Sequence, residues 1–222
     1  MTITVLTSIT GGKDELVNSQ EKGNALFKAF VDTDIASPTW QTKHAYDRFT
    51  DSRRNSRIHK ILAHNYCDTE YSIWIDGNLS LLKPPEELIQ RYLKDHDIAV
   101  FRHPNRNCIY EEAKVCADMG IEDRATLEKQ TTQYKKKGYV EQKGLCECGV
   151  ILRRNTRKVE AFNAMWWAEY CTHSKRDQIS FMYAVERSGI RVNIITEPWI
   201  KVGDRVFRSD FIEYFNHKTP RT

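Results

Sequence analysis

Short apolar runs and helically spaced apolar residues alternate along the chain. Runs rich in branched residues predict strands at 3–6, 26–31, 71–75, 97–101, 149–152 and 192–195. Apolar residues three or four positions apart predict helices at 53–66, 86–93, 110–119, 125–136, 157–170 and 178–185. Such alternation predicts an α/β fold in which helices flank both faces of a mainly parallel central sheet. With no repeat or linker visible, residues 1–222 are expected to form one Rossmann-like domain.

Polar clusters follow three of the expected strands. They lie at 7–14, 32–34 and 76–78, directly after the runs at 3–6, 26–31 and 71–75. In an open α/β sheet, ligands bind beyond the carboxyl ends of the strands. The three clusters therefore predict a ligand site along one edge of the sheet.

The composition and net charge indicate which kinds of ligand the chain can bind. The chain has 222 residues, 40% of them hydrophobic, and a net charge of +4. Mild positive charge fits an anionic ligand such as a nucleotide diphosphate, and it also permits a nucleic-acid acceptor. Because no stretch approaches the roughly 20 apolar residues that span a bilayer, we expect no membrane span. The first residues lack a basic start and a signal-like apolar run, so we expect a cytoplasmic protein.

The six cysteines are expected to be free thiols, as in a cytosolic chain that does not need disulfides. Cys146 and Cys148 form the only close pair. A structural zinc ion requires four ligands, and no second Cys or His pair accompanies these two residues. We therefore interpret them as ordinary core or surface cysteines.

The segment Asp76-Gly77-Asn78 is the strongest candidate for chemistry. It follows the apolar strand at 71–75, and its carboxylate and amide oxygens are both suitable ligands for a hard divalent cation. Such a cation can neutralise a diphosphate leaving group. Gly77 would let phosphates approach the backbone. The same three residues also fit a plain turn between two elements.

Several segments together resemble a plant glycosyltransferase family linked to turgor control and seed mucilage, formerly a domain of unknown function. The resemblance covers about residues 1–185. It rests on segments that occur in the same order: RIHKILAHNYCDTEYSIWIDGNL at 57–79, HPNR at 103–106, YEEA at 110–113, CGVI at 148–151 and RDQISF at 176–181.

This resemblance implies a GT-A fold, a nucleotide-sugar donor in which UDP is the expected nucleotide, and a divalent metal, Mn²⁺ or Mg²⁺. Asp76 and Asn78 would stand in for the Asp-x-Asp motif of metal-dependent GT-A enzymes. The last position departs from that motif, because an amide replaces a carboxylate. Many GT-A enzymes take a late metal ligand from a C-terminal histidine, which makes His217 a candidate, although a terminal histidine is also an ordinary surface residue.

The turn Arg176-Asp177-Gln178 resembles the turn beside the anomeric carbon in retaining enzymes of the glycogenin type. By that resemblance Asp177 binds sugar or acceptor hydroxyls, Gln178 lies under the reacting face, and transfer retains the anomeric configuration. An inverting enzyme would instead need a carboxylate base, for which Asp177, Glu111 and Glu112 are the candidates. Asp177 also fits a simple helix cap, and the two glutamates fit helix-start charge.

The remaining donor-site candidates follow from position. Thr7, Ser8 and Asp32 lie at the first two strand ends, where we expect the nucleoside. Arg57 and Lys60 lie one helical turn apart and can both face the diphosphate, although a solvated helix face explains them equally. His103 lies after the strand at 97–101, near the expected sugar.

Three functions remain open from the sequence. The first is a glycosyltransferase that modifies a hydroxyl of a glycan or protein. The second is a DNA glycosyltransferase that acts on a hydroxymethylated base, which would require base flipping and a basic surface around the site. The third is a non-catalytic nucleotide-binding module on the same fold, because a fold does not prove activity.

Overall fold

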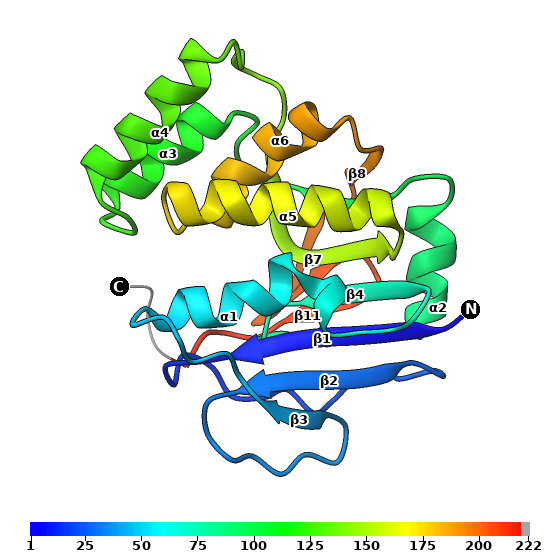
Figure 1. Cartoon of the computed structure of the whole chain (residues 1–222). Helices are drawn as coiled ribbons and strands as arrows, with labels where there is room; N and C mark the ends of the chain where they lie inside the picture. Colours follow the sequence, from blue (N-terminus) through cyan, green and yellow to red (C-terminus); the bar gives the residue numbers. More distant parts are fainter. Residues whose placement is uncertain (219–222) are drawn as a thin grey trace.

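A seven-stranded sheet organises the protein, whose computed structural model describes residues 1–218 (Figure 1). Its strand order is β3-β2-β1-β4-β7-β6-β8. The strands are β1 (Ile3–Ile9), β2 (Leu26–Val31), β3 (Gln41–His44), β4 (Tyr71–Ile75), β6 (Ile98–Arg102), β7 (Cys146–Arg154) and β8 (Val192–Ile195). Only β7 runs against its neighbours β4 and β6, and the other pairs in this sheet are parallel. The expected α/β class with a mainly parallel central sheet is confirmed.

Whereas the sequence predicted helices on both faces of this sheet, the longer helices cover one face, as Figure 1 shows. They are α1 (Ser52–Ile61), α3 (Ile109–Asp118), α4 (Arg124–Lys136), α5 (Arg157–Thr172) and α6 (Asp177–Ser188). Asp51 caps α1 by accepting a hydrogen bond from the Arg54 backbone, and Gly189 ends α6 in the left-handed conformation. In β4, Trp74 packs under the helices whereas Ile73 and Ile75 point to the opposite core, as strand alternation requires.

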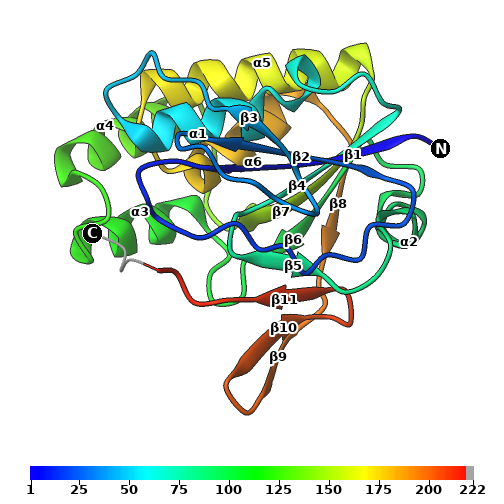
Figure 2. The same cartoon turned by 90° about the horizontal axis from the view of Figure 1, so that it is seen from below.

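A small antiparallel sheet helps to cover the other face (Figure 2). Its order is β5-β11-β10-β9, with strands β5 (Leu79–Leu81), β9 (Trp199–Val202), β10 (Arg205–Arg208) and β11 (Ile212–Tyr214). The run at 192–195 is therefore not the last strand. The later strands have three or four residues each and carry charged side chains, so they give no apolar run to recognise.

Other boundaries also differ from the expectation. The helix expected at 53–66 ends at Ile61 and is followed by the short 3-10 turn η1 (Ala63–Asn65). The helix expected at 86–93 is α2 (Pro85–Leu88), which continues as the π-helical turn η2 (Ile89–Leu93). The polar edge strand β3 was missed because three of its four residues are exposed. Within residues 1–218, none of the helices combines the length and apolar character needed to cross a bilayer.

Candidate active site

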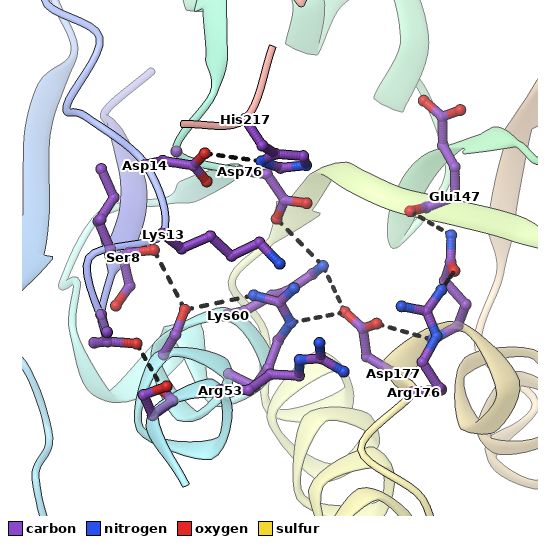
Figure 3. Close-up of a pocket in the computed structure, with 18 residues that line it drawn as sticks. Ser8, Lys13, Asp14, Arg53, Lys60, Asp76, Glu147, Arg176, Asp177 and His217 are labelled. Atoms are coloured by element: carbon purple, nitrogen blue, oxygen red, sulfur yellow. Dashed lines mark hydrogen bonds and ion pairs between the residues drawn. The ribbon is translucent and has the colours of Figure 1, made fainter. Parts of the chain in front are cut away.

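A polar cleft opens at the carboxyl ends of β1 and β4, where the polar clusters of the sequence were expected to meet. It has a volume of about 290 Å³ and lies between the loop after β1, helix α1, the turn after β4 and the start of α6 (Figure 3). Its ionisable lining residues are Lys13, Asp14, Arg53, Arg57, Lys60, Asp76, Glu147, Arg176, Asp177 and His217. Cations and carboxylates thus line the cleft together, as a site for a charged ligand requires.

Asp177 is the most strongly paired carboxylate of the cleft. It is the first residue of α6, after the N-cap Arg176, and only 7% of its side chain is exposed. Its Oδ2 lies 2.6 Å from Lys60 Nζ and 3.3 Å from Arg57 Nε. Burial alone would raise the pKa of Asp177, but Lys60, Arg57 and Arg176 outweigh it and hold the pKa well below its usual range. Asp177 is therefore ionised at neutral pH and is a poor proton acceptor.

Asp76 lies directly after β4, at the floor of the cleft. Its backbone N–H donates to Gly149 O at 2.8 Å, and its Oδ1 accepts from Trp74 Nε1 at 2.8 Å. Lys60 Nζ lies 3.4 Å from the same Oδ1 and so links Asp76 to Asp177. The Asp76 side chain is 29% exposed. Its carboxylate is therefore fixed in direction while still facing the cleft.

Gly77 is needed for close packing of the turn against β1. A Cβ at this position would lie 2.7 Å from Ile9 Cγ1, well inside van der Waals contact. Any larger residue would push the turn, and Asp76 with it, away from the strand end. The glycine thus sets the position of the carboxylate, a role that is additional to the phosphate approach expected from the sequence.

His217 reaches the cleft from beyond the small sheet. Backbone and side-chain hydrogen bonds join Asn78 to Phe215, with distances of 2.9 Å for Phe215 N to Asn78 O and 2.8 Å for Asn78 Nδ2 to Phe215 O. His217 Nδ1 then lies 2.8 Å from Asp14 Oδ1 (Figure 3). This contact orients the ring and leaves Nε2 as its nitrogen for another partner.

A metal at this place would depend on the amide of Asn78. Asp76, Asn78 and His217 line one pocket together, and they supply a carboxylate, an amide oxygen and an imidazole nitrogen. Over residues 1–218, no group of three or more His, Cys, Asp or Glu side chains has the spacing of a metal site. The three predicted ligands fit a divalent ion by their chemistry, because Asn78 uses its Nδ2 and not its Oδ1 to hold Phe215.

A second pocket of about 430 Å³ adjoins the cleft. The two share Asp76, Glu147, Arg176, Gln178 and His217 as a common wall. The rest of the second pocket includes polar groups and an aromatic wall, namely Asn78, His103, Asn105, Arg106, Glu112, Trp199 and Tyr214. Two compartments that meet at one wall suit a reaction between two substrates.

Glu112 and His103 lie in the second pocket, but neither is poised as a base. Glu112 Oε2 lies 2.6 Å from Arg106 Nε, and its Oε1 lies 3.1 Å from Arg176 Nη2. Although burial would raise the pKa of Glu112, these two arginines lower it below its usual value. Burial lowers the pKa of His103 to about 4, so this imidazole is neutral at pH 7.

Gln178 is held at both ends of its amide. Its Nε2 donates to the Glu147 backbone oxygen at 2.9 Å, and its Oε1 accepts from Arg176 Nη2 at 2.7 Å. The amide therefore has one orientation within the wall that separates the two pockets. Such fixed polar groups are what a transfer site needs at its reacting centre.

Glu147, which the sequence analysis did not nominate, lies in the same wall. Its Oε1 accepts from the Tyr214 hydroxyl at 2.6 Å, and Arg208 Nε lies 3.9 Å away. Burial raises the pKa of Glu147 above its usual value, with Arg208 and Tyr214 opposing the shift. The only sequence signal was its place inside the Cys146–Cys148 pair, which draws attention to sulfur rather than to the carboxylate.

The structure does not bring every candidate to the pockets. Ser8, Arg57, Lys60, Asp76, Gly77, Asp177 and Gln178 line the cleft, whereas Thr7, Asp32 and Glu111 line neither pocket. Asp32 holds the loop after β1 by accepting from Gly11 N at 2.6 Å, and Glu111 accepts from the Gln142 amide at 2.9 Å. Lys13 and Asp14 were predicted only as part of the polar cluster at 7–14, and Arg176 only as part of its turn. Arg53 and Glu147 had no earlier nomination.

Comparison with known proteins agrees with this geometry. The sequence profile of the TOD1/MUCI70 glycosyltransferase-like domain matches residues 16–213. The chain belongs to the TOD1/MUCI70 family. It is 30% identical over 156 residues to a protein of Arabidopsis thaliana described as probable hexosyltransferase MUCI70, a match that covers 65% of this chain and 27% of that protein. The chain thus spans about a quarter of that relative's length.

Among solved structures, the apo structure of WbbM, a bifunctional glycosyltransferase, is similar with a TM-score of 0.51. The match covers 87% of this chain and 38% of that chain, at 14% sequence identity. At this identity the likeness shows the fold alone. Family membership and fold together support glycosyltransferase function for this TOD1/MUCI70 domain.

Proposed function

We propose that this TOD1/MUCI70 domain transfers a hexosyl or pentosyl group from a UDP-sugar to an acceptor hydroxyl. The observation that carries this proposal is the shared wall: a cation-rich cleft and a second pocket meet at Asp76, Glu147 and Gln178. The cleft takes the donor, and the second pocket takes the acceptor. The reacting carbon and hydroxyl then meet at the wall, where fixed polar groups act.

Cationic side chains stabilise the diphosphate of the donor in the proposed reaction. Arg53, Arg57 and Lys60 all project from α1 into the cleft. Departure of a nucleoside diphosphate concentrates negative charge on its phosphates, and positioned cations stabilise that charge most when water is excluded. Arg57 and Lys60 are themselves held by Asp177, so their positions are set before the donor binds.

Asp76, Asn78 and His217 would hold a divalent ion, Mn²⁺ or Mg²⁺. When bound, such an ion supplies charge neutralisation for the diphosphate. The protein's own part is to fix the three ligands: Trp74 holds Asp76, Phe215 holds Asn78, and Asp14 holds His217.

We propose further that transfer retains the anomeric configuration. Gln178 has both ends of its amide bound in the wall beside the reacting position. The carboxamide oxygen of Gln178 would stabilise positive charge that develops on the anomeric carbon.

The acceptor side fits a hydroxyl of a glycan or of a protein. Trp199 and Tyr214 form an aromatic wall with ring centroids 4.2 Å apart, while Asn105 and Arg106 add polar groups. Apolar faces combined with a few directed polar groups are typical of pockets for small polar ligands.

Donor hydrolysis tests the proposal without knowledge of the acceptor. The protein is incubated with Mn²⁺ and a panel of nucleotide sugars, and the released nucleotide is measured. We expect slow hydrolysis of one or a few UDP-sugars that stops when EDTA removes the metal. Binding of a nucleotide sugar without any turnover would instead identify a non-catalytic module, and the absence of both would refute the donor assignment.

The stereochemistry is tested on the same reaction. NMR spectra recorded before mutarotation give the configuration of the released sugar. The anomer of the donor should appear first. First appearance of the opposite anomer would overturn the role given to Gln178.

A further inference from the structure

Two backbone irregularities near the start of β7 set the position of Glu147. The pairing of β7 with β6 shifts register between Val100 and Arg102, which faces Cys146. Cys148 has a φ of +50°, a conformation that non-glycine residues seldom adopt. Such irregularities in a strand re-aim side chains and are frequent next to active sites. Here they flank Glu147, whose carboxyl group points away from Asp177 and its cations in Figure 3.

The carboxyl group of Glu147 is only half satisfied. Its Oε1 accepts from the Tyr214 hydroxyl at 2.6 Å, but its buried Oε2 has no hydrogen-bond partner among residues 1–218. The buried Trp199 indole nitrogen lies beside this carboxyl group and lowers the pKa of Glu147, but the two make no well-directed hydrogen bond. A buried polar atom without a partner is costly, so an unpaired oxygen in a pocket wall indicates a group that a ligand completes.

The surroundings of Glu147 favour a proton-accepting role. Burial is the main influence on its pKa and raises it, Asp76 adds to the shift, and Arg208, Tyr214 and Trp199 oppose it. A base works best when its pKa approaches the working pH. Asp177 and Glu112 have the opposite environment, because cations surround them and lower their pKa values. Of these three carboxylates, only Glu147 combines a place in both pockets with an unpaired oxygen.

We propose that Glu147 is the catalytic carboxylate that binds the acceptor hydroxyl and takes its proton. This inference rests on the proposed function. As the acceptor oxygen forms its bond to the anomeric carbon, the bond from that carbon to the diphosphate breaks, and its electron pair leaves with the diphosphate. The proton of the hydroxyl passes to Glu147 Oε2 and is later released to solvent. Tyr214 is the positioning residue that holds the other oxygen.

Donor hydrolysis, in which water takes the place of the acceptor, tests this role in the whole chain. In Glu147→Gln, UDP should bind with a Kd within about twofold of the wild type, as measured by calorimetry. Hydrolysis of the nucleotide sugar that the wild type cleaves should fall by about 100-fold or more. Formate, a small carboxylate, should restore turnover to Glu147→Ala, where it can occupy the vacated space.

The matched control is Glu213→Gln. Glu213 is a buried carboxylate of β11 that pairs with Arg205 at 2.6 Å and lines neither pocket, so its hydrolysis rate should match the wild type. Unchanged hydrolysis in Glu147→Gln, or equal losses of UDP binding and rate, would overturn the proton-accepting role. The role would also be overturned if Glu147→Ala binds UDP but formate does not restore its hydrolysis. If the wild type itself hydrolyses no nucleotide sugar, the proposed function fails instead.

Discussion

The two sides of the shared wall hold buried carboxylates in opposite electrostatic settings. On the helix side, Asp177 faces Lys60 and Arg57, and these cations keep its pKa well below the usual range. On the side of the small sheet, Glu147 has a tyrosine hydroxyl and a more distant arginine, and burial raises its pKa. A buried carboxylate with close cations holds those cations in place and stabilises the fold. A buried carboxylate that is only partly paired is available for proton transfer.

The largest expected effect comes from Asp76→Ala, which removes the carboxylate that both compartments share. Hydrolysis of the nucleotide sugar should fall by about 1,000-fold, because the leaving diphosphate loses its main stabilising site. Steady-state measurement of nucleotide release checks this. Asp118→Ala, at an exposed ion pair with Arg124, is the control that should keep wild-type turnover. Turnover near the wild-type level in Asp76→Ala would remove Asp76 from the mechanism.

Lys60→Met tests the helix side of the wall, because it removes one of the cations that surround Asp177. Lys60 is almost fully buried and joins Asp177 to Asp76, so its loss leaves Asp177 with a weaker set of cations. We expect the free energy of unfolding at pH 7 to fall by about 3 kcal/mol, as for other buried pairs that lose one partner. Urea denaturation measures this change.

Lys135→Met provides the matched surface control. Lys135 pairs with Glu141 at 3.0 Å, but more than half of each side chain is exposed. Its replacement should change the unfolding free energy by less than about 1 kcal/mol. Equal effects of the two lysine substitutions would show that the buried network does not stabilise the protein.

Asp177→Asn separates positioning from proton transfer. Since Asp177 is a poor proton acceptor, we expect hydrolysis to fall only about tenfold, the scale of a lost hydrogen bond to the sugar or of displaced cations. Measured beside Glu147→Gln, the Asp177 variant should keep the greater activity. If the Asp177 variant loses several orders of magnitude while the Glu147 variant does not, the roles of the two carboxylates are exchanged.

The same Asp177 variant should change the pH dependence of stability. The pKa of Asp177 is depressed in the folded protein, so its contribution is present above the unfolded-state value of about 4 and is lost as pH falls below it. Asp177→Asn should lack that part of the acid destabilisation. Urea denaturation at pH 3 and pH 6 compares the two proteins, and parallel losses in both would contradict the assignment.

The smallest effect is expected from Tyr214→Phe. The substitution keeps the ring and removes the 2.6 Å hydrogen bond to Glu147, which is equivalent to about 1 kcal/mol or roughly a fivefold loss of turnover. Because Tyr214 opposes the raised pKa of Glu147, the acidic limb of the pH–rate profile should move to higher pH. A profile that stays in place with lower activity throughout would indicate a structural role only.

The sequence by itself determined the sheet-forming runs, the main helices and the convergence of polar strand ends. These features depend on local periodicity and on the rule that parallel strands end at one edge, and both are readable without coordinates. Asp76, Lys60 and Arg57 were found in this way, because each lies at a strand end or on a recognisable helix. The family resemblance added Asp177 and Gln178, and the late metal ligand of many GT-A enzymes suggested His217.

Only the tertiary structure decided which carboxylates have partners. Asp14 and His217 are 203 residues apart along the chain and meet because β11 joins β5 in the small sheet. Tyr214, the hydrogen-bond partner of Glu147, lies in that same sheet. The short charged strands of this sheet give no periodic pattern in the sequence. Charge pairing and burial arise from long-range packing, and these two quantities set the pKa of each acid. The sequence therefore located the cleft, and the fold assigned its chemistry.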